Sequence, residues 1–332
     1  MTIKGTNIVI TGGAGFIGSS LVKKLVVLGS KVKVFDNLSS GTLQNLKTVR
    51  SKITFVKGDI LNKKLLIKEF NKADIVSHQA AQLEITRAID DPTYDLKINT
   101  IGTINVLSAA GKCKVKNCYN ASSACVYGQA KTKIQTENHL TNPNWGYGVS
   151  KLAAEKYAHI ISNQTNLPVT SLRYSIVYGP NEWYGRVLTI LLKRALENKD
   201  LVIFGQGSQI RDFVFIDDVV DLNIKCITNR RSENQIFNVS TGKPTSISTL
   251  AKLVKRYLNP CIKIIKENVK KGETSKIINR QRLPQELQRM TLSPKKAKKL
   301  LNWHPKTSLK QGLIKEFKWL KNNKSRWKNM SY

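Results

Sequence analysis

The sequence lacks the features that mark membrane proteins, disulfide-rich proteins and zinc-binding proteins. No apolar stretch among its 332 residues approaches the roughly 18–20 that a membrane-spanning helix requires. Its five cysteines form no Cys-x-x-Cys pair, and only four histidines accompany them. No signal-peptide pattern precedes the first strand-like run, which begins at Asn7. We therefore expect no membrane span, no disulfides and no metal site, and free thiols in the cytoplasm.

Acidic residues are also scarce. Asp and Glu number 22 against 55 Lys and Arg, a net charge of +33, while hydrophobic residues make up 41% of the chain and can form a sizeable core. Residues 261–332 alone carry 20 Lys or Arg and 4 Asp or Glu. Such a balance is found in proteins that bind nucleic acids or anionic surfaces. The basic residues are spread out and mostly Lys, with no zinc-finger or RNP-type signature, so we expect a solvated surface and no nucleic-acid partner.

Short apolar runs alternate with helical patterns through the first half of the chain. Strands are expected at 7–11, 32–35, 53–56, 74–77, 117–121 and 169–174. Helices are expected at 16–28, 61–70, 94–110 and 145–163. Strands that alternate with helices through short connections form a parallel sheet with helices on both faces. The sequence therefore predicts an α/β fold with a doubly wound parallel sheet.

The pattern changes after Gly179 and Pro180. Helices are expected at 187–197, 217–227, 246–258, 294–301 and 309–320, and strands at 213–215 and 236–239. We predict a first domain over residues 1–180 with return elements near 210–240, and a smaller mixed α/β domain over 181–320. The remaining residues, 321–332, form a polar, basic tail that we expect to fray.

A glycine-rich turn joins the first strand to the first helix. Glycine occupies positions 12, 15 and 18. Such a turn lets the backbone approach a pyrophosphate, and the free N–H groups at the start of the helix bind the anion. The first domain is therefore predicted to be of the Rossmann type and to bind a dinucleotide.

The acidic residue at the end of the second strand indicates which dinucleotide is bound. The carboxylate of Asp36 can accept hydrogen bonds from both adenosine ribose hydroxyls and would repel a 2′-phosphate. No Arg follows it in Asn37–Gly41. We therefore predict NAD rather than NADP.

Three further residues suit acid–base chemistry on a hydroxyl–ketone pair. Tyr147 and Lys151 lie four residues apart at the start of a predicted helix, and so on one face of it. The Lys ammonium is expected to stabilise the phenolate and lower the tyrosine pKa from its usual ~10 toward neutrality. Ser123 follows the strand at 117–121, where it can hydrogen-bond the reacting oxygen.

Together, these motifs resemble the NAD-dependent nucleotide-sugar epimerase/dehydratase group of the extended short-chain dehydrogenases/reductases. The matching segments run in order along nearly the whole chain and include TGGAGFIGSSL, VFDNLSSG, HQAAQ, SSACVYG, YGVSK and RDFVFIDDVV. The resemblance implies a homodimer with a C-terminal substrate-binding domain. It implies that NAD is bound by Gly12, Gly15, Phe16, Ile17, Gly18, Asp36, Asn37, Asp59, Ile60, Ala80, Ala81, Asn99, Tyr147, Lys151 and Tyr174. It implies that a nucleotide sugar is bound by Ser123, Cys125, Arg211 and Arg282.

The residues after Ser123 discriminate among the reactions of this group. By resemblance, 4,6-dehydratases carry an Asp-Glu pair there and decarboxylases a Glu, whereas this chain has Ala124 and Cys125. This favours C4 epimerisation of a UDP-hexose or UDP-N-acetylhexosamine through a transient 4-keto intermediate. Cys125 leaves a second function open, because the segment around it also resembles GDP-sugar epimerases and reductases in which this thiol is an acid/base. The Lys or His that would partner the thiol is missing from Asn181–Arg186. Another NAD-dependent sugar-nucleotide oxidoreductase is the remaining alternative.

Overall fold

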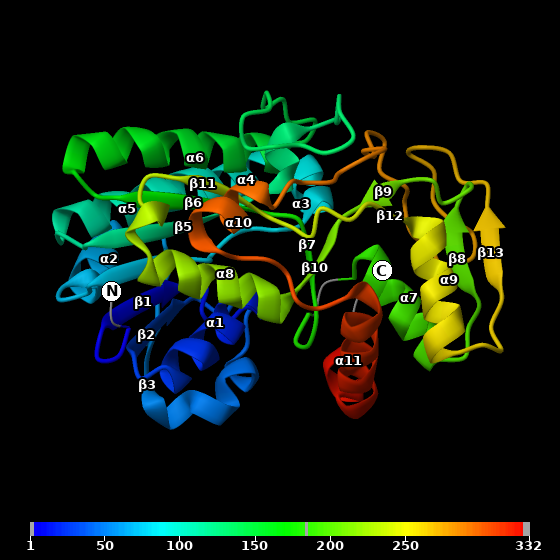
Figure 1. The fold of residues 1–332 in the computed structure, drawn as a ribbon, viewed down its shortest axis with the longest axis horizontal. Helices are drawn as coiled ribbons and strands as arrows, with labels where there is room; N and C mark the ends of the chain where they lie inside the picture. The colour runs from blue at the N-terminus through cyan, green and yellow to red at the C-terminus, as the bar shows by residue number, and fades with distance from the viewer. Residues whose placement is uncertain (1–2, 183–184, 328–332) are drawn as a thin grey trace.

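The computed structural model describes residues 3–182 and 185–327 and contains a large parallel sheet with helices on both faces (Figure 1). The seven strands follow the order β11-β6-β5-β4-β1-β2-β3, and every neighbouring pair is parallel. They are β1 (Asn7–Thr11), β2 (Lys31–Asp36), β3 (Ile53–Lys57), β4 (Ile75–His78), β5 (Asn117–Ser123), β6 (Val169–Tyr174) and β11 (Ile236–Val239). The predicted doubly wound sheet is confirmed. From β1 the chain adds β2 and β3 on one side, and then β4, β5 and β6 on the other, so the strand order reverses between β1 and β4. This reversal opens a crevice at the carboxyl ends of β1 and β4.

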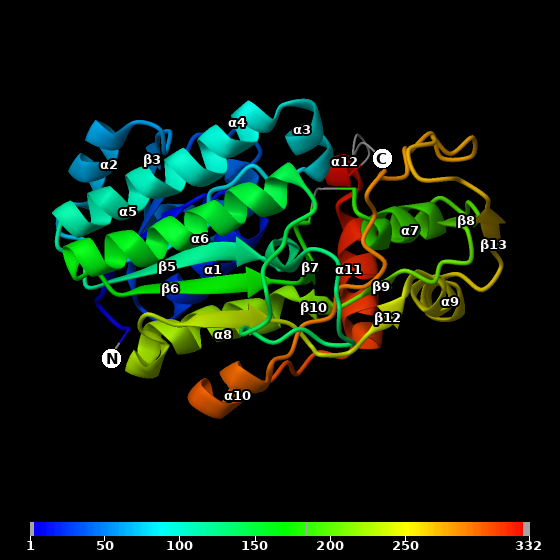
Figure 2. The same cartoon turned by 90° about the horizontal axis from the view of Figure 1, so that it is seen from above.

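Alternate residues of β1 show how the two helical layers bury the sheet. Ile8 and Ile10 belong to the core on the side of α1 (Phe16–Val27) and α8 (Ile216–Thr228). Val9 belongs to the core on the opposite side. That side is covered by α2 (Lys63–Phe70), α5 (Gly102–Lys112) and α6 (Gly146–Thr165), as Figure 2 shows. A strand buried on both faces needs a continuous apolar run, which is why the run at 7–11 was readable from sequence.

The single helix predicted over 94–110 is interrupted in the structure. It consists of α4 (Pro92–Leu96), a π-helical turn at Lys97–Ile101 and α5. The wider turn buries Asn99 and Thr100 against α6, where the Thr100 hydroxyl donates to the backbone carbonyl of Ser150 at 3.0 Å. Such turns occur often beside functional sites, and this one lies behind the cavity described below.

The elements after β6 build a second group beside the sheet. Its helices α7 (Val187–Leu196) and α9 (Ile247–Leu258) lie with β8 (Leu201–Phe204) and β13 (Ile264–Glu267) at the end of the molecule far from β3 (Figures 1 and 2). The sequence pattern misses the short strands β7 (Ile176–Tyr178), β8 (Leu201–Phe204), β9 (Ile210–Arg211), β12 (Thr245–Ser246) and β13 (Ile264–Glu267). They pair as β7 with β10 (Phe213–Phe215), β9 with β12 and β8 with β13. Runs of two to four residues are too short to show an alternating period.

The expectation of a frayed tail is wrong for residues 321–327. Helix α11 (Leu309–Asn322) continues into α12 (Lys324–Trp327), and Trp327 is buried. The indole nitrogen of Trp327 donates to the Leu320 carbonyl. The predicted tail residues 328–332 lie outside the described part of the chain.

The described residues contain neither a membrane-spanning helix nor a cluster of metal ligands. Within residues 3–182 and 185–327, no helix is long and apolar enough to cross a bilayer. The same residues hold no group of three or more His, Cys, Asp or Glu that could bind a metal ion. All five cysteines are free thiols.

Two glutamates are buried near each other where α11 meets the segment that follows β7. Glu182 is 4% exposed and Glu316 is fully buried. Burial raises the pKa of Glu182 to about 7. Burial raises the pKa of Glu316 as well, and the neighbouring Glu182 raises it further. Among the described residues, neither carboxylate oxygen of Glu316 has a hydrogen-bond partner. Burial and the proximity of the two carboxyl groups therefore favour the protonated form of each.

We expect Glu316→Gln to stabilise the fold above neutral pH. The folded-state pKa of Glu182 is about 7, against an ordinary value of 4.5, so unfolding releases protons and stability falls as pH rises between these values. The substitution removes one of the two charges and should raise the free energy of unfolding at about pH 8 by roughly 1–3 kcal/mol, with little change near pH 5. Urea unfolding at both pH values measures this, with the exposed Glu273→Gln as control. An equal shift at both pH values would contradict the account.

Candidate active site

Glycines allow the turn between β1 and α1 to pack closely against neighbouring backbone. Gly12 has φ +68°, and a Cβ there would lie 2.5 Å from the backbone nitrogen of Ala80, just after β4. A Cβ on Gly18 would lie 2.1 Å from the Gly12 carbonyl oxygen. Helix α1 begins at Phe16 beside the cavity, so its first N–H groups are available to a pyrophosphate.

Asp36 ends β2 at the same edge of the sheet. Its two carboxylate oxygens accept hydrogen bonds from the backbone N–H groups of Ala14 and Leu38, each at 2.8 Å. Burial raises the pKa of Asp36, and these two hydrogen bonds oppose the rise. Asn37 Nδ2 donates to the Asp59 carboxylate at 3.0 Å, and this hydrogen bond joins the two side chains next to Asp36. A carboxylate fixed in this way retains lone pairs for ribose hydroxyls, so the residues present fit the adenosine half of NAD.

One cavity of about 910 Å³ runs from the glycine turn to the loop at 278–283. It brings together eighteen of the nineteen residues that the sequence proposed for the site. They are Gly12, Gly15, Phe16, Ile17, Gly18, Asp36, Asn37, Asp59, Ile60, Ala80, Ala81, Ser123, Cys125, Tyr147, Lys151, Tyr174, Arg211 and Arg282. Its size is that of a small-molecule site.

Asn99 is the one proposed residue that is not among those lining this cavity. Its side chain is buried one layer behind the wall. Its Oδ1 accepts from the Gln82 backbone N–H, and its Nδ2 donates to the Gln82 carbonyl, both at 3.0 Å. The side chain therefore holds the backbone that follows Ala80 and Ala81.

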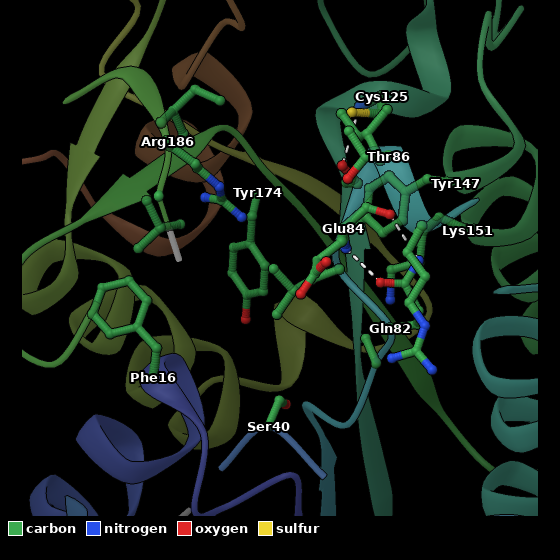
Figure 3. Close-up of a pocket in the computed structure, with 18 of the residues that line it drawn as sticks. Phe16, Ser40, Gln82, Glu84, Thr86, Cys125, Tyr147, Lys151, Tyr174 and Arg186 are labelled. Carbon is green, nitrogen blue, oxygen red and sulfur yellow. Dashed lines mark hydrogen bonds between the residues drawn. The ribbon is translucent and has the colours of Figure 1, made fainter. Parts of the chain in front are cut away.

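The three candidate catalytic side chains line the cavity, and Figure 3 shows Tyr147 and Lys151 together on one wall. Ser123 is the last residue of β5, and Tyr147 and Lys151 come from the first two turns of α6. The Ser123 hydroxyl accepts from the Cys125 N–H at 3.1 Å, and its interaction with the Tyr147 phenol lowers the pKa of that phenol against the larger effect of burial. A hydroxyl oxygen placed between Ser123 and Tyr147 would meet a hydrogen-bond donor and a proton acceptor.

Burial controls the acid–base properties of these groups. It raises the pKa of Tyr147, so the predicted lowering of this pKa is not seen. The charge of Arg186 acts against that rise. Burial also lowers the pKa of Lys151 to about 8. Both effects have one physical cause, since a charged form loses hydration in the cavity wall.

Asp95 is a residue of this site that the sequence analysis missed. It is buried in α4, and its charge raises the pKa of Lys151 against the effect of burial. Its carboxylate accepts from Gln82 Nε2 and from Asn99 Nδ2, both at 2.9 Å. Inside a predicted helix, an acidic residue gives no sequence signal that distinguishes it from a solvated one.

Arg186 is the second residue that was missed. Figure 3 shows it on the wall opposite Tyr147 and Lys151. Its charge lowers the pKa of the Cys125 thiol, although burial raises that pKa more strongly. The resemblance implied a Lys or a His in this segment, so an Arg there gave no signal.

The two predicted phosphate-binding arginines meet at one carboxylate. Arg282 Nε lies 2.9 Å from Glu286, and Arg211 Nη2 lies 3.9 Å from the same side chain. Arg211 belongs to β9, whereas Arg282 belongs to the loop that closes the far end of the cavity. Glu286 thus holds two planar cations side by side, an arrangement that suits a diphosphate.

The chain is similar to known proteins in both sequence and fold. The sequence matches the model of the NAD dependent epimerase/dehydratase family over residues 8–240. It is 35% identical to a protein of Methanocaldococcus jannaschii, covering 95% of this chain and 99% of the relative. It is 32% identical to the UDP-glucose 4-epimerase of Mycolicibacterium smegmatis, covering 94% and 98%. The crystal structure of a Thermotoga maritima UDP-glucose 4-epimerase with UDP-glucose superposes with a TM-score of 0.86 at 32% identity, covering 96% of this chain and 99% of that one.

Replacing Asp95 by Asn is expected to make Lys151 deprotonate at lower pH. The Asp95 charge holds up a pKa that burial has already lowered to about 8. Its loss should lower this pKa further, because the opposing negative charge is removed. Competitive acylation of Lys151 across a pH series, read by peptide mass spectrometry, measures the change. The exposed Asp90→Asn serves as control, and coincident labelling curves for wild type and Asp95→Asn would contradict the assignment.

Proposed function

The chain belongs to the family of NAD-dependent epimerases and dehydratases, and we propose that it inverts C4 of a UDP-hexose or a UDP-N-acetylhexosamine. NAD is its cofactor, as predicted from Asp36. Relatives of similar identity include dTDP-D-glucose 4,6-dehydratases, so family membership alone leaves the reaction open. The choice of reaction therefore depends on the residues around the reacting carbon.

One observation carries the choice of epimerisation. Ser123, Tyr147 and Lys151 share a wall of the cavity, but the next two residues after Ser123 are Ala124 and Cys125. A dehydratase needs a carboxylic acid at that point to eliminate water. Both positions are buried in the short turn Ala124–Tyr127 and carry no carboxyl group. The site can remove and return a proton at a hydroxyl, but these two positions provide no acid for elimination.

The side chains divide the work of a reversible oxidation at C4. When bound, NAD supplies the two-electron oxidation of the sugar carbon and its reversal. Tyr147 takes the proton of the C4 hydroxyl as the carbon is oxidised, and Ser123 donates a hydrogen bond to the same oxygen. Lys151 and Arg186 are the cations that favour the phenolate form of Tyr147. After the 4-keto sugar turns in the cavity, Tyr147 returns the proton and the opposite C4 epimer is formed.

The environment of Cys125 supports C4 over C3 or C5 chemistry. Its thiol pKa is raised by burial, so it is a neutral group in the wall. The cations that act on this thiol are Arg186 and Arg211, and a guanidinium stays protonated in proteins and cannot act as an acid/base partner. We therefore infer that Cys125 shapes the pocket, and that Arg211 and Arg282 bind the substrate diphosphate beyond it.

A homodimer and a cytoplasmic location stay predictions from the sequence. An exposed apolar stripe on α6 supports the homodimer. Val149, Tyr157 and Ile160 in this stripe are 50%, 44% and 46% exposed, and Ile101 beside them is 47% exposed. Apolar side chains of this size on adjacent helices suit contact with a second copy.

Tyr147→Phe is expected to abolish interconversion of the C4 epimers while leaving NAD bound. Loss of the proton-transferring hydroxyl should reduce the rate by roughly 10²–10⁴-fold. UDP-glucose and UDP-N-acetylglucosamine would be incubated with each protein and the products resolved by chromatography. Tyr157→Phe is the matched control, since it removes a phenol from the exposed side of the same helix. Full activity in Tyr147→Phe would exclude the proposed role.

A further inference from the structure

We propose that α12 is a strap that holds the cofactor-binding turn in place, with Arg326 as its positioning residue. This inference concerns NAD binding and depends on the family's cofactor, not on which sugar is the substrate. The strap joins three parts of the chain that are far apart in sequence: the turn after β1, the segment after β7 and the C-terminal helix.

The strap is anchored by Trp327. This side chain is 3% exposed, and its indole donates to the Leu320 carbonyl at the end of α11. The ammonium of Lys193, from α7, lies 5.9 Å from the centre of the Trp327 ring. An aromatic side chain buried in this way fixes α12 against the rest of the molecule.

Arg326 extends from this anchor to two asparagines. Its Nη1 donates to Asn181 Oδ1 at 3.1 Å, and its Nη2 donates to Asn45 Oδ1. Asn181 opens the segment that leads to Arg186, whereas Asn45 is 2% exposed in the 3₁₀ segment Leu43–Lys52. A guanidinium offers several donors in a rigid plane, so one side chain can bridge two separate acceptors.

Asn45 carries the contact into the cofactor-binding turn. Its Nδ2 donates to the Ala14 carbonyl at 2.8 Å, and the Ala14 N–H donates to the Asp36 carboxylate at 2.8 Å. Ala14 lies between Gly12 and Gly15 in the turn expected to hold the pyrophosphate. A line of hydrogen bonds therefore runs from α12 to the carboxylate expected to hold the ribose.

Arg326 determines which way the Asn45 amide points. An amide has one end that accepts and one that donates, and the two ends have nearly the same shape. Because Arg326 is a donor alone, it requires the oxygen end and leaves the NH₂ end facing Ala14. Without Arg326, the Asn45 amide loses the contact that holds its oxygen, and its hydrogen bond to the Ala14 carbonyl is less firmly positioned. Arg326 thus acts on NAD affinity through Asn45.

The test measures NAD affinity of the full chain by calorimetry after bound cofactor has been removed. Arg326→Ala should weaken NAD and ADP-ribose by the same factor, roughly 5- to 20-fold, because the strap acts on the adenosine side. Lys324→Ala is the matched control, as it removes an exposed charge from the same helix. Arg326→Lys keeps the charge but loses the two-armed fork, and should also bind NAD more weakly.

Two outcomes separate this role from a general effect on folding. In an Asn45→Ala background, Arg326→Ala should produce no further loss of affinity, because the connection is already cut. The proposal is overturned if the loss persists undiminished in that background. It is equally overturned if Arg326→Ala lowers the unfolding temperature of the ligand-free chain and leaves both dissociation constants unchanged. Neither readout requires sugar turnover, so failure here is distinct from failure of the proposed reaction.

Discussion

The closeness of the β1–α1 turn to the end of β4 is the constraint on which the rest of the site depends. A side chain at Gly12 or Gly18 would overlap backbone atoms, so this approach exists only with glycine at both positions. It brings the N-terminus of α1 and Asp36 to one side of the crevice. The strand order reverses here, so Ser123 at the end of β5 and Tyr174 at the end of β6 lie on the other side. Cofactor and substrate residues thus face each other across one cavity.

Removal of water sets the chemistry of that cavity. Burial disfavours both the Tyr147 phenolate and the Lys151 ammonium, so each depends on charges from its surroundings. Arg186 acts on the phenol from the opposite wall, and Asp95 acts on the ammonium from behind. The reacting groups and their electrostatic partners therefore come from different segments of the chain. Changes in the loop at 185–186 or in α4 should be felt at the catalytic tyrosine.

Site residues that belong to a local sequence pattern could be predicted, whereas residues that depend on contacts between distant segments of the chain could not. The glycine spacing, the acid after the second strand and the Tyr–Lys spacing are local, and each of these residues lines the cavity. Asn99 is not among the lining residues, and the π-helical turn that contains it had no signal in the sequence. Asp95 and Arg186 depend on contacts made across the fold and have no signature of their own. The same is true of α12, whose basic composition indicated a frayed end although Trp327 anchors it.

The most direct test of the central claim follows deuterium at C4 during turnover. The purified protein, with no NAD added, would be given UDP-glucose or UDP-N-acetylglucosamine labelled with deuterium at C4 in ordinary water. A C4 epimerase that oxidises and re-reduces the same carbon should yield the other epimer with its deuterium retained. An epimer that has exchanged its deuterium for solvent hydrogen, a 4-keto-6-deoxy product, or no conversion of either substrate would contradict the account.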